Sequence, residues 1–184
     1  MRRVQAADEV ALSRLMERWE LPVKRLLARI VLNATEAEEL AQETFVRVWQ
    51  QRDKFRDGAA LRPWIFAIAA NLARNRLRWW KRRPVVALDD WTEVPTHDGG
   101  ADDSGTRRLE RAERVKAVRD AIADLPGELR ESLVLFEYEQ MSYAEIAETV
   151  GASPKAIESR IARARGKLGL ALKSWAKNHG DYDA

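Results

Sequence analysis

The sequence predicts an all-α protein of two small helical bundles joined by a flexible acidic linker, with a helix-turn-helix in the second bundle. Apolar residues recur at spacings of three and four on both sides of a central segment, and no stretch alternates as a half-buried strand does. The central segment, residues 84–106, has six acidic residues, no Lys or Arg, two Pro and three Gly. Repulsion between its like charges favours an extended linker.

These patterns divide the chain into a first bundle (1–83), the linker (84–106), a second bundle (107–176) and a polar tail (177–184). Residues 1–83 carry 18 Lys and Arg against 10 Asp and Glu. Such an excess of positive charge favours a polyanionic partner.

Composition excludes several classes of function. The chain has no cysteine, which rules out disulfides and thiolate zinc sites. His97 and His179 lie in polar segments without a ligand-spaced partner, so we expect no metal, no other cofactor and no histidine-based catalysis. No apolar run is long enough to insert in a membrane, and the first residues lack the apolar core of a secretory signal. We expect a cytoplasmic protein that is not an enzyme.

The first bundle is expected to contain helices up to about Arg82. Leucines and other apolar residues between positions 12 and 31 repeat at helical spacing, and Pro22 predicts a kink or break among them. Thr35 and Glu38 have the spacing of a capping box at the start of the next helix. A further helix should begin near Ala59.

The end of this last helix, "NLARNRLRWWKRR", has six cations, two adjacent tryptophans and no carboxylate. On a helix its polar residues share one face, opposite an apolar face from Leu61 to Trp79. Arginine alone would suit phosphates, but asparagine amides also suit base edges, so we expect DNA contacts. Trp79 and Trp80 would either stack on unpaired bases or join the core. A solvated basic face is the alternative. The predicted DNA-binding residues are Trp64, Asn71, Arg74, Asn75 and Arg78.

The second bundle should begin with a helix whose apolar residues run from Leu109 to Leu125, followed by one over residues 128–139. The next segment, "SYAEIAETVGASPKAIESRIARARGKL", has the signals of a helix-turn-helix. Ser142 and Glu145 form a capping box, Gly151 suits the left-handed turn, and Ser153 caps the second helix.

Such a second helix enters the major groove of DNA by its N-terminal half. We therefore expect its outward residues to contact bases and its basic end to hold phosphates. A helical hairpin without a ligand is the alternative. The predicted base-facing residues are Lys155, Glu158, Ser159, Ala162 and Arg163, and the predicted phosphate contacts are Arg160, Arg163, Arg165 and Lys167.

Taken in order, these motifs resemble the extracytoplasmic-function (ECF) sigma factors of the sigma-70 family, over residues 8–83 and 107–170. "EAEELAQETFVRVWQQRDKF" is similar to the family's region 2.2, which docks on the clamp helices of the largest RNA polymerase subunit. "LRPWIFAIAANLARNRLRWWKRR" resembles regions 2.3 and 2.4, which capture and melt the minus-ten element. The stretch from "LPGELRESLVLF" through "RARGKL" resembles region 4, which reads the minus-thirty-five element.

The resemblance implies further partners and roles. Glu39, Gln42 and Glu43 would face core polymerase, with the polymerase flap as a second contact, and Asn71 and Asn75 would read the minus-ten element. The loop 55–62 would accept a flipped-out base, a step that costs a few kcal/mol. The linker would thread a polymerase channel, with a plain tether as the alternative. An anti-sigma factor would silence the protein in trans.

Glu158 departs from the family, whose members commonly carry a basic residue at this position. A glutamate accepts from the cytosine amino group but repels phosphate, so we expect an unusual minus-thirty-five preference. Two other classes of protein remain possible on the residues alone. A stand-alone helix-turn-helix regulator would need a self-complementary surface, and a DNA-processing enzyme would need clustered acids for metal.

Overall fold

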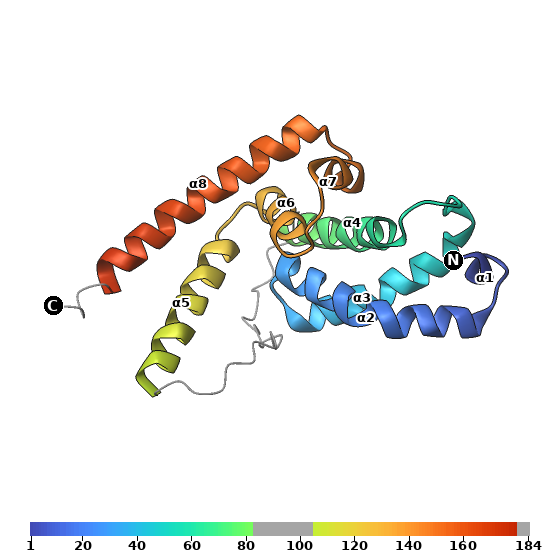
Figure 1. The fold of residues 1–184 in the computed structure, drawn as a ribbon, viewed down its shortest axis with the longest axis horizontal. Coiled ribbons are helices and arrows are strands. Elements are labelled where there is room, and N and C mark those ends of the chain that lie inside the picture. The colour runs from blue at the N-terminus through green and yellow to red at the C-terminus, as the bar shows by residue number, and fades with distance from the viewer. Residues whose placement is uncertain (83–104, 180–184) are drawn as a thin grey trace.

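The computed structural model describes residues 1–82 and 105–179, and within these ranges it contains helices and no β-strand (Figure 1). The all-α class, the paired bundles and the helix-turn-helix are therefore confirmed. The expected linker, apart from its last two residues, and the end of the polar tail lie outside the described residues. No described helix is long and apolar enough to cross a bilayer.

The first bundle packs three long helices around a core rich in leucine and isoleucine. The helices α2, α3 and α4 all contact one another, and Phe66 and Ile65 are fully buried among them. Its elements are α1 (Arg2–Gln5), α2 (Glu9–Val31), α3 (Ala34–Gln50), the 3-10 turn η1 (Arg52–Lys54) and α4 (Leu61–Arg82).

Pro22 lies inside one continuous helix, so of the kink or break expected there the break is wrong, while the kink stays a prediction. A proline removes one intrahelical hydrogen bond and crowds the preceding turn. In α2 this loss is offset by the residues that follow, because Val23, Leu26 and Leu27 are completely buried. Tertiary packing therefore decides the helix length against the local signal.

The start of α3 also differs from the expectation. Asn33 is the N-cap, and its Oδ1 accepts a hydrogen bond of 2.8 Å from the backbone N–H of Glu36. The predicted capping box of Thr35 and Glu38 is therefore wrong, because the helix has already begun at Ala34. Glu38 instead pairs with Lys24 of α2 at 2.7 Å.

The second bundle consists of α5 (Gly105–Ala123), α6 (Gly127–Glu137), α7 (Tyr143–Val150) and α8 (Pro154–His179). The capping box of Ser142 and Glu145 is confirmed, and Gly151 has the left-handed φ of 69°. Ser153 Oγ accepts from the N–H of Ala156 at 3.2 Å, as predicted.

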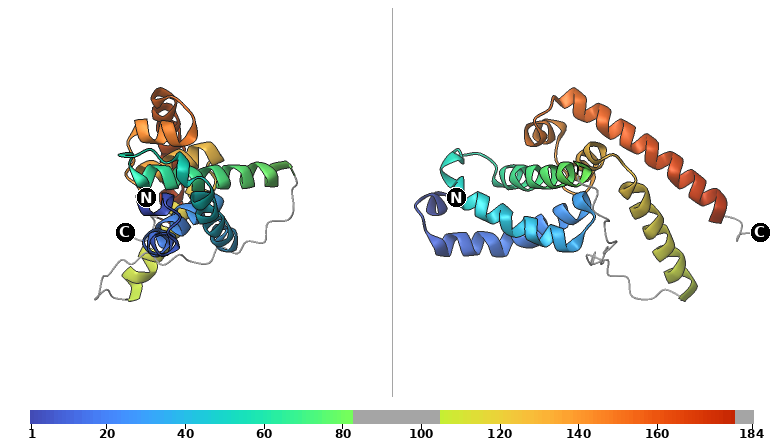
Figure 2. Two further views of the ribbon diagram at one scale, coloured as in Figure 1. Left: turned by 90° about the vertical axis from the view of Figure 1, so that its right-hand side faces the viewer. Right: turned by 180° about the vertical axis from the view of Figure 1, so that it is seen from behind.

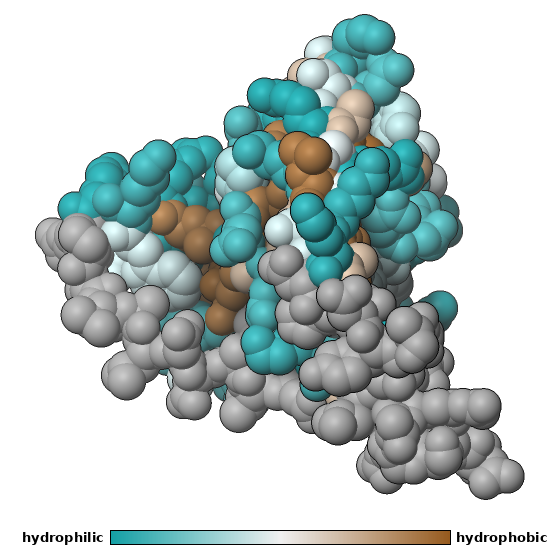
Figure 3. Space-filling view, turned by 90° about the vertical axis from the view of Figure 1, so that its left-hand side faces the viewer, coloured by the Kyte–Doolittle hydropathy of each residue, from teal (hydrophilic) through white to brown (hydrophobic). Residues whose placement is uncertain are grey.

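Within residues 112–123 of α5, apolar side chains are buried only near the C-terminal end. Ala121 is buried, and Leu125, in the turn after α5, packs against α8, whereas Val115 and Val118 remain exposed. The reason is that α5 and α8 diverge away from the core (Figure 1). Figure 3 views the molecule from the side on which α5 and α8 project, and it shows apolar side chains among hydrophilic ones. Leu170 of α8 is another large apolar residue that is exposed there.

The two bundles pack directly against each other, which the sequence did not predict. Helices α6 and α7 contact α2 and α4 (Figures 1 and 2), and one continuous cluster of buried residues spans both bundles. Glu139 accepts a hydrogen bond of 2.9 Å from Arg62 and lies 3.7 Å from Arg29. Arg29 also lies over the ring of Tyr138, at 4.3 Å from its centroid. We call this packing the closed arrangement.

Candidate nucleic-acid and partner interfaces

The basic face of α4 is only partly available in the closed arrangement. Asn71, Asn75 and Arg78 are exposed to solvent, as DNA-reading residues must be. Arg74 is held by the second bundle: its guanidinium donates to both oxygens of Glu131, at 2.8 and 3.2 Å. Because the Glu131 side chain is only 5% exposed, this bidentate pair is well shielded from water.

The three tryptophans of α4 have different surroundings. Trp64 is half-buried and contacts Phe55 edge to face, with ring centroids 5.2 Å apart. Trp80 is also half-buried and packs against the core. Trp79 is 41% exposed, so it does not share the buried face of Ile65 and its neighbours. The adjacent tryptophans are thus divided between core and surface.

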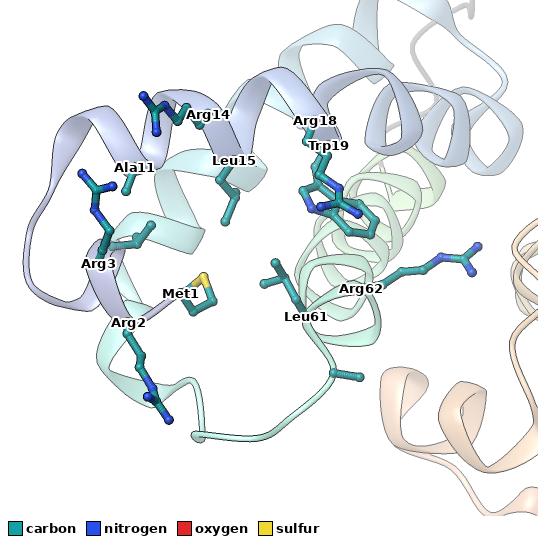
Figure 4. Close-up of a pocket in the computed structure, with 12 residues that line it drawn as sticks. Met1, Arg2, Arg3, Ala11, Arg14, Leu15, Arg18, Trp19, Leu61 and Arg62 are labelled. Atoms are coloured by element: carbon teal, nitrogen blue, oxygen red, sulfur yellow. The ribbon is translucent and has the colours of Figure 1, made fainter.

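A cavity of about 780 Å³ lies beside the loop that precedes α4 (Figure 4). Its lining includes apolar side chains such as Leu15, Trp19 and Leu61. Cationic side chains surround it, and three of them donate to carboxylates. Arg2 donates to Asp57 at 3.0 and 2.8 Å, Arg3 to Asp8 at 2.7 Å and Arg62 to Glu139 at 2.9 Å. The sequence did not reveal this cavity, because its residues come from separate elements. The arginines that line it are Arg2, Arg3, Arg14, Arg18 and Arg62.

The second helix of the helix-turn-helix, α8, presents the predicted residues to solvent. Ile157, Ile161 and Ala164 are buried on the opposite face. The exposed residues are Lys155, Glu158, Ser159, Ala162 and Arg163. They lie on the N-terminal half of the helix, where a recognition helix meets base edges.

Glu158 interacts with another of these residues. Its carboxylate accepts a hydrogen bond of 2.8 Å from Lys155 Nζ. This hydrogen bond is the main reason that the pKa of Lys155 is raised. The pair therefore partly neutralises the start of the recognition helix.

Of the four predicted phosphate contacts on α8, two have a carboxylate partner and two have none among the described residues. Arg165 donates to Glu137 at 2.6 Å, and Arg160 lies 3.3 Å from Glu128. Arg163 and Lys167 are exposed, and no described carboxylate lies within ion-pair distance of either. These two are the cations most available to phosphate.

Arginines of the protein itself neutralise part of the negative charge on the acidic face of α3. Arg76 of α4 pairs with Glu36 and lies 3.8 Å from Glu39. Glu43 accepts from Arg47 at 3.0 Å, one turn along the same helix.

Between these ion pairs, α3 exposes residues without charge. Gln42 is exposed, and so is 52% of Val46, which lies one turn further along. Sequence reasoning missed Val46, although its position off the apolar stripe of Phe45 and Val48 was a usable signal. The face therefore combines acids with an exposed apolar residue.

Comparison with known proteins agrees with the order of these elements. Residues 15–83 match the family model for sigma-70 region 2, and residues 116–168 match that for sigma-70 region 4. The RNA polymerase sigma-H factor of Pseudomonas aeruginosa is 34% identical over 93% of this chain and 91% of its own. The chain belongs to the ECF sigma factors of the sigma-70 family. The ECF RNA polymerase sigma-E factor of Haemophilus influenzae is 33% identical, over 89% of this sigma factor and 88% of its own chain.

Solved structures share the fold of this ECF sigma factor. The structure of CnrH in complex with the cytosolic domain of CnrY is similar with a TM-score of 0.65 and 26% identity, covering 94% of each chain. The sigma factor RpoE in complex with the anti-sigma factor NepR from Bartonella quintana has a TM-score of 0.68 and 24% identity. That likeness covers 88% of this chain and 96% of RpoE.

Proposed function

We propose that this ECF sigma factor directs core RNA polymerase to promoters, without catalytic activity of its own. In this proposal α8 reads the minus-thirty-five element and α4 reads and melts the minus-ten element. One observation carries it: each bundle presents a cationic helix with exposed polar residues, on the two segments that match sigma-70 regions. Such an assembly works where the polymerase and the chromosome are, in the bacterial cytoplasm.

The recognition helix supports the minus-thirty-five assignment. Lys155, Ser159 and Arg163 are exposed on the groove-facing half of α8 and offer donors to base edges. Arg163 and Lys167 then approach phosphates. Glu158 adds an acceptor suited to a cytosine amino group.

Melting is assigned to α4 and the adjoining loop. Asn71 and Asn75 are exposed one turn apart and can pair with base edges. The cavity beside Leu61 is apolar inside and surrounded by arginines, which suits an unpaired base with its phosphates. We propose that it receives part of the opened strand.

We assign the binding of core polymerase to α3. Glu39, Gln42 and Glu43 supply polar contacts, and Val46 supplies apolar area that is now exposed to water. Charge complementarity with basic groups would steer this face onto its partner.

Promoter binding requires the bundles to separate. In the closed arrangement Arg74 is occupied by Glu131, so it is not available to the minus-ten strand. We propose that association with polymerase stabilises an open form, and that an anti-sigma factor acts in trans on the surfaces that polymerase uses. The sigma factor RpoE, which shares this fold, has been solved bound to the anti-sigma factor NepR.

Transcription in vitro tests the proposal. Purified protein is added to core polymerase with fragmented genomic DNA, and the 5′ ends of the transcripts are mapped. We expect RNA that starts at a small set of sites sharing two upstream elements, and we expect the double variant Asn71→Ala/Asn75→Ala to lose it. Protection of DNA without any start-site-specific RNA would instead indicate a stand-alone helix-turn-helix regulator.

A further inference from the structure

A second cavity, of about 620 Å³, lies between the two bundles. It is lined mainly by the C-terminal half of α4 and the start of α6, with single residues from α2, α7 and α8, and its size is that of a small-molecule site. Five cationic and two acidic side chains line it, which gives a net charge of +3. The cations are Arg74, Arg78, Lys81, Arg130 and Arg160.

Three of these charges have no counterpart. The two acids of the cavity are already engaged, since Glu131 binds Arg74 and Glu128 lies beside Arg160. No described carboxylate lies within ion-pair distance of Arg78, Lys81 or Arg130. The net positive charge of the cavity can therefore be neutralised only by an anion from outside the described residues.

Arg130 is the most informative of the three. Only 7% of the residue is exposed, its Nη1 donates to the carbonyl of Ala123 at 2.8 Å, and its Nε has no partner among the described residues. Burial lowers the pKa of Arg130, which reflects the cost of holding its charge away from water. A bound anion would offset that cost.

The start of α6 points the same way. This helix of 11 residues begins after Pro126, and no described side chain caps it. Its first backbone N–H groups are donors without an intrahelical partner, and the helix dipole favours negative charge there. Pro126 and Gly127 both line the cavity, so the helix end and Arg130 contribute to one site.

We propose that this cavity binds a small molecule that carries a chain of phosphate groups, and that its binding stabilises the closed arrangement. Three uncompensated cations and a helix N-terminus match three or more phosphate charges. Ile30, Leu77 and Val150 add apolar lining that would accommodate a nucleoside. Because the ligand contacts both bundles, it would oppose promoter binding by linkage.

Calorimetry on the full chain tests the site, with tripolyphosphate and adenosine triphosphate as probes in magnesium-free buffer. We expect one saturable site, weakened at least fivefold by Lys81→Gln and by Arg130→Gln. The control Lys173→Gln removes an exposed charge elsewhere on α8 and should leave affinity within twofold. Tighter binding of the nucleotide would identify a nucleoside polyphosphate as the ligand class, and equal binding a free oligophosphate.

The proposal is overturned if neither probe saturates at millimolar concentration, or if all three variants weaken binding equally. Circular dichroism checks that Arg130→Gln folds. If it does not fold, Lys81→Gln, at an exposed position, tests the site by itself. The absence of native cysteine allows dyes at Gln50→Cys and Ala171→Cys to report on closure. Tripolyphosphate should enrich the closed population, and unchanged populations would refute the bridging role. Neither readout involves transcription, so failure here is distinct from failure of the promoter function.

Discussion

Glu158 accepts a hydrogen bond of 2.8 Å from Lys155 on the exposed face of α8 that we propose meets DNA. Replacing this acid changes both the charge of the helix and the freedom of its neighbour. We predict that Glu158→Lys tightens binding to minus-thirty-five duplexes and steepens the dependence of log K on log salt by roughly one or two, about 0.9 for each added phosphate contact. Fluorescence anisotropy across a salt series measures this.

The matched control is Glu148→Lys, which makes the same charge change at an exposed position of α7. It should leave the preferred bases unaltered, whereas Glu158→Lys should change the preference at one position. Identical binding profiles for wild type and Glu158→Lys would mean that Glu158 takes no part in recognition.

The capping box of the helix-turn-helix gives a second prediction. Hydrogen bonds from Ser142, the backbone N–H first, lower the pKa of Glu145. A lowered pKa stabilises the fold above the ordinary glutamate value, and this contribution is lost as the pH falls through the folded-state pKa. We expect Ser142→Ala to reduce the free energy of unfolding by about 1 kcal/mol at neutral pH, and by less below about pH 4.

Urea denaturation followed by circular dichroism measures both values. Ser174→Ala, at an exposed position of α8, serves as the control and should change stability little. A loss that did not vary with pH would show that the hydrogen bond from the Ser142 hydroxyl to the ionised Glu145 carboxylate contributes nothing, since the backbone N–H bond is kept in the variant.

Among the helices, α2 is notable because it continues through Pro22. Restoring an N–H at this position would add the hydrogen bond to the carbonyl of Arg18 that proline cannot make. We predict that Pro22→Ala raises the free energy of unfolding by about 1–3 kcal/mol, without altering DNA binding. A destabilised variant in thermal melts would show that the local geometry imposed by proline is needed for packing.

The exposed face of α3 gives a prediction about the partner. Burying Val46 against polymerase would contribute on the order of 1.5 kcal/mol, which is about tenfold in affinity. We expect Val46→Asp to weaken binding to core polymerase by at least that factor in surface plasmon resonance. Val10→Asp places the same change on an equally exposed valine of α2 and should bind normally.

How well each element was anticipated depends on how local its signals are. The helix-turn-helix was predictable because Ser142, Gly151 and Ser153 act on backbone groups within three residues of themselves. The prediction of a break at Pro22 was wrong because the burial of Val23 and its neighbours is not visible in the local sequence. The exposed residues of α8 were placed correctly by periodicity, whereas the engagement of Arg74 required knowledge of the other bundle.

On the scale of the whole molecule, the closed arrangement depends on acids that look like surface residues in the sequence. Glu131 and Glu139 lie on or just after an amphipathic helix, yet only 3% and 7% of them are exposed. Each is paired with arginine from the first bundle. Removing one member of a shielded pair leaves the other uncompensated, which destabilises the state that contains it.

We therefore predict that Glu131→Gln shifts the population toward the open form and strengthens binding to a single-stranded minus-ten oligonucleotide several-fold. Anisotropy with labelled oligonucleotide and dye pairs on the two bundles measure the two effects. Glu113→Gln, an exposed neutralisation on α5, is the control. Unchanged or weaker oligonucleotide binding by Glu131→Gln would contradict the role of this pair.

The bidentate contact of Arg74 with Glu131 has a consequence for engineering and for evolution. Here the C-terminal segment supplies the counter-charge that restrains Arg74, the side chain of the N-terminal segment that we propose reads the promoter. A hybrid whose transplanted C-terminal segment lacks an acid at that position would leave Arg74 unpaired. We expect such a hybrid to bind minus-ten DNA without restraint, even when both parents are tightly controlled.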